Sequence, residues 1–196
     1  MAPMSSTEPR FDSTRRAELL RLARASILHG LETGRPLAVD PADFDPELAA
    51  PGAAFVTLHR QGELRGCIGS LEAHRPLVVD VAENAFAAAF RDPRFPPLAV
   101  DEFDDLEIEI SVLSPPEPMA FTDEADLLRQ IRPGVDGLIL EDMGRRGTFL
   151  PSVWAQLPRR EDFLAHLKLK AGLPPGHWSP TVRVWRYTTE SFAEQQ

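Results

Sequence analysis

The spacing of apolar residues predicts a long helix near the start of the chain. Leucine, alanine and isoleucine recur at helical intervals across residues 19–27. Asp12 or Ser13, ahead of this stretch, has a side chain suited to capping the first turn of a helix. Gly30 or Gly34 is suited to end the helix. We therefore expect it to run from Asp12 or Ser13 to Gly30 or Gly34.

A long loop and then a β-hairpin are predicted next. Residues 34–52 are rich in proline and aspartate, which is typical of a loop. Residues 53–60 alternate between apolar and polar, Gly62 supplies a positive φ for the turn, and residues 64–70 (LRGCIGS) form the returning strand. Side chains alternate along a strand, which predicts one face with Leu64, Gly66 and Ile68 and another with Arg65, Cys67 and Gly69.

The rest of the chain mixes strands and helices without regular alternation. Helices are predicted at residues 76–90, 123–131, 151–157 and 161–173, and strands at residues 106–113, 137–142, 147–151 and 181–189. Hairpins interspersed with helices favour an α+β fold with a mainly antiparallel sheet and flanking helices. The pattern gives no boundary between two independent domains.

Composition places the chain among globular proteins. It has 196 residues, of which 43% are hydrophobic and 26% charged. Residues 1–11 are polar, contain proline and are predicted to form a disordered tail without the apolar core of a secretion signal. No apolar run approaches the roughly 20 residues that cross a bilayer, and a single cysteine excludes an internal disulfide. We therefore expect a cytoplasmic protein with no membrane partner.

The formal net charge of −9 disfavours nucleic acid as a partner, because proteins that bind it usually present a basic face. It leaves room for a small anion held in an arginine-lined pocket. Metal binding is not expected, because the five histidines are dispersed and no metal-ligand spacing occurs. No cofactor is predicted, and the sequence leaves the oligomeric state open.

Several segments, read in order, resemble one known family. They are FVTLHRQGELRGCIGSLEAHRPL, AAAFRDPRFPPL, LEIEISVLSPP, GVDGLIL, GTFLP and LKAGL. The chain resembles the AMMECR-type domain family, known in prokaryotes as protein A of the AmmeMemoRadiSam gene set, over residues 12–190. The most specific element is LRGCIG followed downstream by DPRFPPL.

This resemblance implies a single α+β domain over residues 12–190, with two lobes and a cleft between them near which the motifs gather. It implies two candidate partners, a Memo-like protein and a radical S-adenosylmethionine protein, but no particular reaction. The family's motif positions carried over to this sequence are Arg65, Gly66, Cys67, Gly69, Asp92, Arg94, Phe95, Ser111, Thr148, Pro151, Lys170 and Gly172. From these we take Cys67 as the candidate catalytic residue and Arg65, Gly66, Gly69, Arg94, Thr148 and Lys170 as candidate substrate-binding residues.

Three roles stay open for Cys67. A thiol is nucleophilic as the thiolate, and a neighbouring cation such as Arg65 would lower its pKa from the usual value of about 8.5. A nucleophile also needs a base within reach, for which His59 and His74 are candidates. Cys67 would otherwise line a ligand site, with Gly66 and Gly69 allowing close approach, or fill the core as a small apolar side chain.

Arg65, Arg94 and Lys170 form a second candidate group. The planar guanidinium of arginine suits carboxylate or phosphate, but Arg94 could equally form a structural ion pair with Asp92 or Glu109. Two hypotheses follow. The first is a transferase or hydrolase that uses Cys67, and the second is a non-catalytic module that binds a ligand or a partner segment in the cleft.

Overall fold

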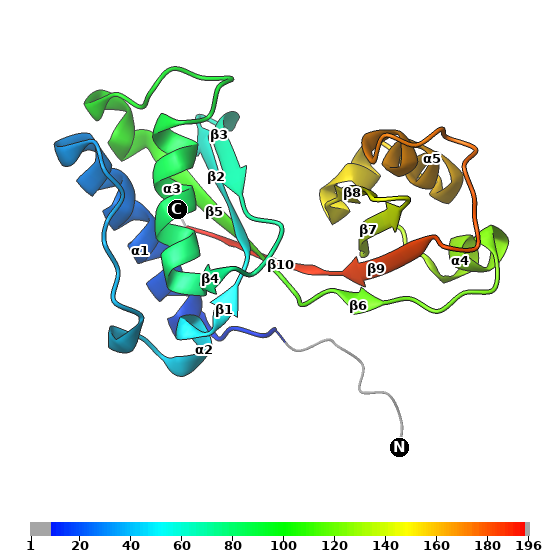
Figure 1. Cartoon of the computed structure of the whole chain (residues 1–196). Coiled ribbons are helices and arrows are strands. Elements are labelled where there is room, and N and C mark those ends of the chain that lie inside the picture. The colour runs from blue at the N-terminus through cyan, green and yellow to red at the C-terminus, as the bar shows by residue number, and fades with distance from the viewer. Residues whose placement is uncertain (1–8, 195–196) are drawn as a thin grey trace. The chain divides into compact units, whose positions relative to one another are not determined.

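The computed structural model describes residues 9–194, and the chain divides into two compact units (Figure 1). Unit 1 holds the described residues up to Leu113 together with the segment from Glu190 onward, and unit 2 holds Ser114–Thr189. The chain therefore leaves unit 1 after Leu113 and returns to it at Glu190.

Unit 1 combines helices with an antiparallel sheet. Its elements are α1 (Ser13–Thr33), the 3-10 helix η1 (Pro41–Asp43), α2 (Pro46–Ala49), β1 (Pro51–Gly52), β2 (Ala54–Arg60), β3 (Glu63–Gly69), β4 (Arg75–Pro76), α3 (Leu77–Phe90), the 3-10 helix η2 (Val100–Asp105), β5 (Leu106–Leu113) and β10 (Thr189–Ala193). The main sheet has the strand order β10-β5-β2-β3, and β1 pairs separately with β4. The edge strands of the main sheet are thus β10 and β3.

The helix α1 confirms the first prediction. Asp12 accepts a hydrogen bond from the Arg15 N–H as the N-cap, and Gly34 ends the helix with a φ of 71°. The apolar stripe of α1 and most of α3 pack with one face of the sheet into a single core (Figure 1). Fully buried members of this core include Leu19, Ile27, Val56, Leu58, Val78, Val81, Ile108 and Ile110.

The predicted hairpin is also confirmed. Strands β2 and β3 pair antiparallel, and the turn uses Gln61 at φ 54° and Gly62 at φ 79°. Two successive positive φ values are typical of the tight turns that suit the twist of a hairpin. The hairpin lays β3 along the edge of the sheet, where the LRGCIG motif is found.

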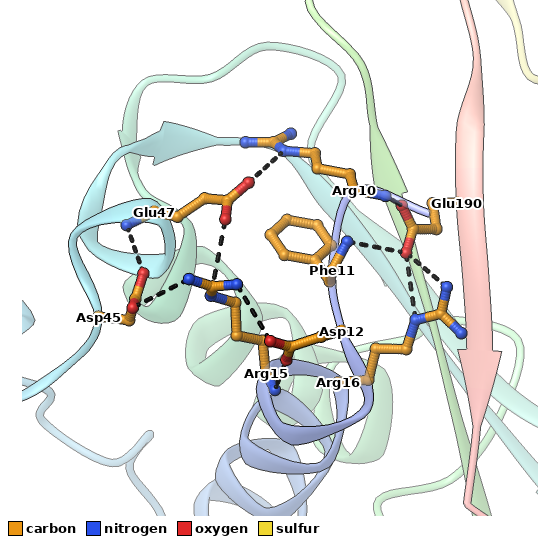
Figure 2. Close-up of polar contacts among 8 residues, drawn as sticks. All are labelled: Arg10, Phe11, Asp12, Arg15, Arg16, Asp45, Glu47 and Glu190. Carbon is orange, nitrogen blue, oxygen red and sulfur yellow. Dashed lines mark hydrogen bonds and ion pairs between the residues drawn. The ribbon is translucent and has the colours of Figure 1, made fainter. Parts of the chain in front are cut away.

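The predicted N-terminal tail is too long at its C-terminal end. Residues 1–8 lie outside the described residues, but Phe11 is fully buried in the core of unit 1. The backbone N–H groups of Arg10 and Phe11 donate to the Glu190 carboxylate, which also pairs with Arg16 (Figure 2). An apolar ring and a carboxylate from β10 therefore hold this segment in place.

The predicted loop over residues 34–52 contains short elements. Asp40 caps η1 and Asp45 caps α2, each directly followed by a proline in the first turn. Arg15 on α1 pairs with Asp45 and with Glu47, which fastens this segment to the helix (Figure 2). The absence of hydrophobic periodicity hid these elements, although the Asp-Pro dipeptides were signals for them.

Unit 2 is built around a second antiparallel sheet with the order β6-β9-β7-β8. Its elements are β6 (Glu117–Pro118), α4 (Glu124–Gln130), β7 (Gly137–Asp142), β8 (Arg145–Phe149), the 3-10 helix η3 (Pro151–Ala155), α5 (Arg160–Lys170) and β9 (Arg183–Tyr187). The unit has a core of its own, in which Trp154 stacks on Phe163 with ring centroids 3.8 Å apart. Helices with antiparallel sheets in both units confirm the predicted α+β class.

Candidate functional site

The motif segment lies on β3, with Cys67 directly opposite Thr57 of β2. The Cys67 Sγ and the Thr57 Oγ1 are 3.3 Å apart and share a hydrogen bond. The thiol is half-buried, and it lies on the face of the sheet opposite the one that carries Val56 and Leu58. Cys67 therefore does not belong to the core of unit 1, which removes one of its three predicted roles.

A β-bulge changes the predicted faces of β3. The register shifts so that Leu58 pairs with Gly66 and His59 pairs with Leu64, which leaves Arg65 without a partner residue on β2. A bulge inserts one residue and reverses the alternation beyond it. Leu64 therefore shares the face of His59 and is 40% exposed, and the prediction that it shares a face with Gly66 and Ile68 is wrong.

The bulge also redirects Arg65. Its Nε and Nη2 donate to the two carboxylate oxygens of Glu102 at 2.8 Å each, and Nη2 also donates to the carbonyl of Pro96. These hydrogen bonds hold the pKa of Glu102 down at about 2, against an ordinary value near 4.3. The expectation that Arg65 serves the thiol is thus corrected, because its charge is balanced by Glu102.

Asp92 and Arg94 close the free edge of the sheet at Cys67. The Asp92 carboxylate accepts the Cys67 backbone N–H at 2.9 Å, and Arg94 Nη2 donates to the Cys67 carbonyl at 3.4 Å. Arg94 pairs with Asp92 at 2.7 Å and, as the main cause, holds the pKa of this carboxyl well below its usual range. The pair satisfies backbone groups that an edge strand would otherwise leave open, which confirms the structural ion pair weighed above.

The two glycines of the motif are required by the packing of unit 1 itself. A Cβ at Gly66 would overlap the carbonyl oxygen of Ala88 in α3. A Cβ at Gly69 would overlap the ring of Phe55, its direct partner across the hairpin. The space that each glycine leaves open is filled by the protein, so neither glycine needs a ligand to explain it.

Thr148 and Lys170 lie in unit 2. The Thr148 hydroxyl is 3.1 Å from that of Tyr187, which donates to the carbonyl of Phe149. The Lys170 ammonium lies 5.0 Å from the centre of the Phe149 ring. The predicted site residues thus form two groups, one in each unit, and the prediction that they share a cleft stays a prediction.

The face of the unit 1 sheet opposite α1 and α3, called here the Cys67 face, carries two rows of side chains that include Cys67. One row runs across the strands from Glu109 through Thr57 to Cys67, and the next from Glu107 through His59 to Leu64. His59, the nearest candidate base, makes no hydrogen bond to Cys67 within the described part of unit 1. The face thus offers a thiol, a hydroxyl, an imidazole and carboxylates, but no described hydrogen bond of unit 1 joins a base to the thiol.

Three residues of this region were missed or undervalued at the level of sequence. Thr57 could have been found only from the hairpin register. Glu102 lies in the acidic run 101–105, which looks like an ordinary solvated segment. Asp92 was noted as a motif position but not taken as a site residue, although a carboxylate two residues before Arg94 was a usable signal.

Two cavities lie within single units. One of about 610 Å³ in unit 1 is lined by residues of α1, η2 and β5 and by Glu194. One of about 590 Å³ in unit 2 adjoins Asp142, whose buried carboxylate accepts hydrogen bonds from His177, Ser179 and Thr181. This cluster could not be recognised from the sequence, because three of its members come from a loop about 35 residues away from Asp142.

The described residues hold neither a metal-binding cluster nor a helix that could span a membrane. No group of three or more histidine, cysteine, aspartate or glutamate side chains in residues 9–194 is arranged to hold a metal ion. Within the same range, no helix has the length and apolar character needed to cross a bilayer.

Comparison with known proteins agrees with the motifs. The AMMECR1 family model matches residues 20–192. A protein of Methanothermobacter thermautotrophicus is 40% identical over 195 residues, which cover 98% of this chain and 97% of the relative, and one of Thermococcus gammatolerans is 43% identical over 90% and 89%. The crystal structure of protein PH0010 from Pyrococcus horikoshii is similar, with a TM-score of 0.77 and 40% identity over 91% of this chain and 90% of that one. The chain belongs to the AMMECR1 family.

Proposed function

We propose that this protein is a binding module whose functional surface is the Cys67 face, and that it acts in the cytoplasm with a Memo-like protein and a radical S-adenosylmethionine protein. One observation carries the proposal. The two motif arginines of unit 1 are engaged by Glu102 and Asp92, while Cys67 and Thr57 stay half-buried on the sheet face opposite the one on which α1 and α3 pack.

Physical reasons favour binding over catalysis. A thiol nucleophile needs a base within hydrogen-bond reach and a means of stabilising the thiolate. The thiol's hydrogen-bond partner within unit 1 is the Thr57 hydroxyl, which is no base at neutral pH. A sheet face with a few polar groups can nevertheless receive a ligand or a partner segment.

The single cysteine allows a clean test. N-ethylmaleimide labels only Cys67, so labelled and unlabelled protein can be compared in co-purification from the native host, with Cys67→Ser treated identically as the matched control. We expect the unlabelled protein to recover a Memo-like or radical S-adenosylmethionine protein, labelling to reduce that recovery, and the treated Cys67→Ser protein to be unaffected by the reagent. Equal recovery with and without the label on Cys67 would exclude this face as the binding surface.

An enzyme that uses Cys67 as its nucleophile is a second candidate, favoured by Arg94. The pKa of Arg94 is raised, mainly by its hydrogen bonds to Asp92, and its Nη2 lies 3.4 Å from the Cys67 carbonyl oxygen, so a guanidinium stands beside the cysteine. The alkylation rate of Cys67 against pH tests this candidate. A midpoint well below about 8.5 with a raised rate would support it, and the rate and midpoint of a model thiol would defeat it.

A further inference from the structure

The unbalanced charge in the middle of the Cys67 face is negative. Glu109 lies on β5 directly opposite Thr57, in the row that ends at Cys67. Its side chain is half-buried and makes no hydrogen bond or ion pair with any described residue of unit 1.

The cations near the motif are already neutralised. Arg65 donates to both carboxylate oxygens of Glu102, and Arg94 pairs with Asp92. An anionic ligand would have to compete with carboxylates that are fixed beside these guanidinium groups and bonded in two places. A cationic ligand would instead meet the unpaired carboxylate of Glu109, which has given up part of its hydration without gaining a partner.

The spread of the polar groups bears on the size of the ligand. Glu109, Thr57 and Cys67 come from three neighbouring strands, so the row spans two strand spacings, about 10 Å. Small-molecule sites are concave and their polar groups converge. Groups spaced across a sheet face suit an extended polypeptide better, since its side chains can reach several of them at once.

We infer that the Cys67 face binds a basic segment of a partner protein, with the Glu109 carboxylate receiving the charge of a lysine or arginine. This inference rests on the proposed function, because it assumes that the Cys67 face is the binding surface. The inference replaces the expected anionic ligand with a cationic one. It also makes Glu109 the residue that selects for a positive charge.

The first test measures the electrostatic potential at Cys67. The rate constants for reaction with the cationic 2-(trimethylammonium)ethyl and the anionic 2-sulfonatoethyl methanethiosulfonate are compared, and their ratio is divided by that for 2-mercaptoethanol. Two charges about 10 Å apart interact enough for Glu109→Gln to lower this ratio by about threefold or more at low salt. Glu32→Gln removes the same charge from an exposed position on α1 and should leave the ratio unchanged.

The same ratio can be compared at low and high salt in the wild-type protein, without any variant. Raising the salt from about 0.01 M to about 1 M shortens the Debye length from about 30 Å to about 3 Å. The ratio should then fall toward the value for the model thiol. A ratio that is unchanged both by salt and by Glu109→Gln would overturn the inference while leaving Cys67 accessible.

The second test asks which ligand covers the face. Ten-residue oligolysine should slow the alkylation of Cys67 by neutral iodoacetamide, and Glu109→Gln should remove most of that protection, whereas Glu32→Gln should not. Oligoglutamate should not protect. Protection by oligoglutamate would overturn the choice of charge, and equal protection by lysine amide at the same concentration of positive charge would overturn the choice of a polypeptide.

These outcomes separate the inference from the proposed function. If native protein reacts with none of the reagents, the Cys67 face is closed and both proposals fail. If Cys67 reacts and N-ethylmaleimide blocks partner recovery, but oligolysine gives no protection, the proposed function stands and the basic segment is wrong.

Discussion

The Glu102 carboxylate is the main hydrogen-bond acceptor for Arg65, near the start of β3. Its carboxylate accepts two hydrogen bonds from Arg65, one from Arg60 and one from the Ala99 backbone N–H. The Arg65 side chain is only 11% exposed, so its charge has little access to water. Loss of the acceptor would leave a buried cation poorly satisfied, which costs more than the loss of an exposed ion pair.

We therefore expect Glu102→Gln to lower the free energy of unfolding at pH 7 by about 2 kcal/mol, in the range for hydrogen bonds to charged groups. Urea unfolding measures this value. The exposed Glu32→Gln serves as the control and should change it by less than about 0.5 kcal/mol. Equal effects of the two substitutions would show that the Glu102 pair contributes nothing beyond surface charge.

The pH dependence of the same variant follows from the lowered pKa of Glu102, about 2 when folded. Because the folded pKa lies below the unfolded value of about 4.3, the contribution is full above that value and is lost as the pH falls toward 2. The difference in unfolding free energy between wild type and Glu102→Gln should thus hold from pH 8 to pH 5 and be clearly smaller at pH 3. A difference that is constant from pH 5 to pH 3 would contradict the ion pair.

At the scale of elements, the contact between β3 and α3 sets the position of the motif strand. Gly66 faces the backbone of α3 at Ala88 so closely that any side chain would push the helix and the strand apart. Overpacking against backbone typically costs 1–3 kcal/mol, and occasionally more, because the backbone cannot move aside as a side chain can.

Gly66→Ala is expected to lower the free energy of unfolding by roughly 3 kcal/mol, measured by urea or thermal unfolding. Gly176→Ala is the matched control, because a Cβ there meets nothing within 4 Å. It should be neutral or slightly stabilising through the unfolded chain. A mild effect at Gly66 would mean that α3 and β3 separate easily, contrary to their packing.

The elements also show which features can be predicted from a sequence. The helix α1 and the strand β5 were predicted closely because their caps and hydrophobic periods are local. The strand β10 was missed because Thr189–Ala193 is largely polar and pairs with β5, which lies about 80 residues earlier. The bulge at Arg65 was missed because one inserted residue leaves no trace in the hydrophobic pattern, and with it the link between Arg65 and Glu102.

For the whole molecule, the order of the chain makes unit 1 discontinuous. Its edge strand β10 begins at the last residue of unit 2, and it is fixed to α1 on the core side of the sheet. Phe192 joins the unit 1 core, while Glu190 pairs with Arg16 and Glu194 pairs with Arg24 at 2.6 Å. Unit 1 therefore needs the last described residues of the chain to complete its sheet, whereas unit 2 has its core within one continuous segment.

This division predicts that two matched phenylalanine substitutions destabilise different units. Phe192→Ala removes a ring that is 9% exposed in unit 1, and Phe163→Ala removes a fully buried ring in unit 2. Each should cost about 3 kcal/mol or more, but in its own unit, because the two cores share no residue. Hydrogen exchange at the level of single amides measures both, with Ile108 and Ile110 reporting on unit 1 and Leu138 and Leu140 on unit 2. We expect Phe192→Ala to speed exchange mainly at the first pair and Phe163→Ala mainly at the second; the same loss of protection in both units for either variant would show that they unfold as one.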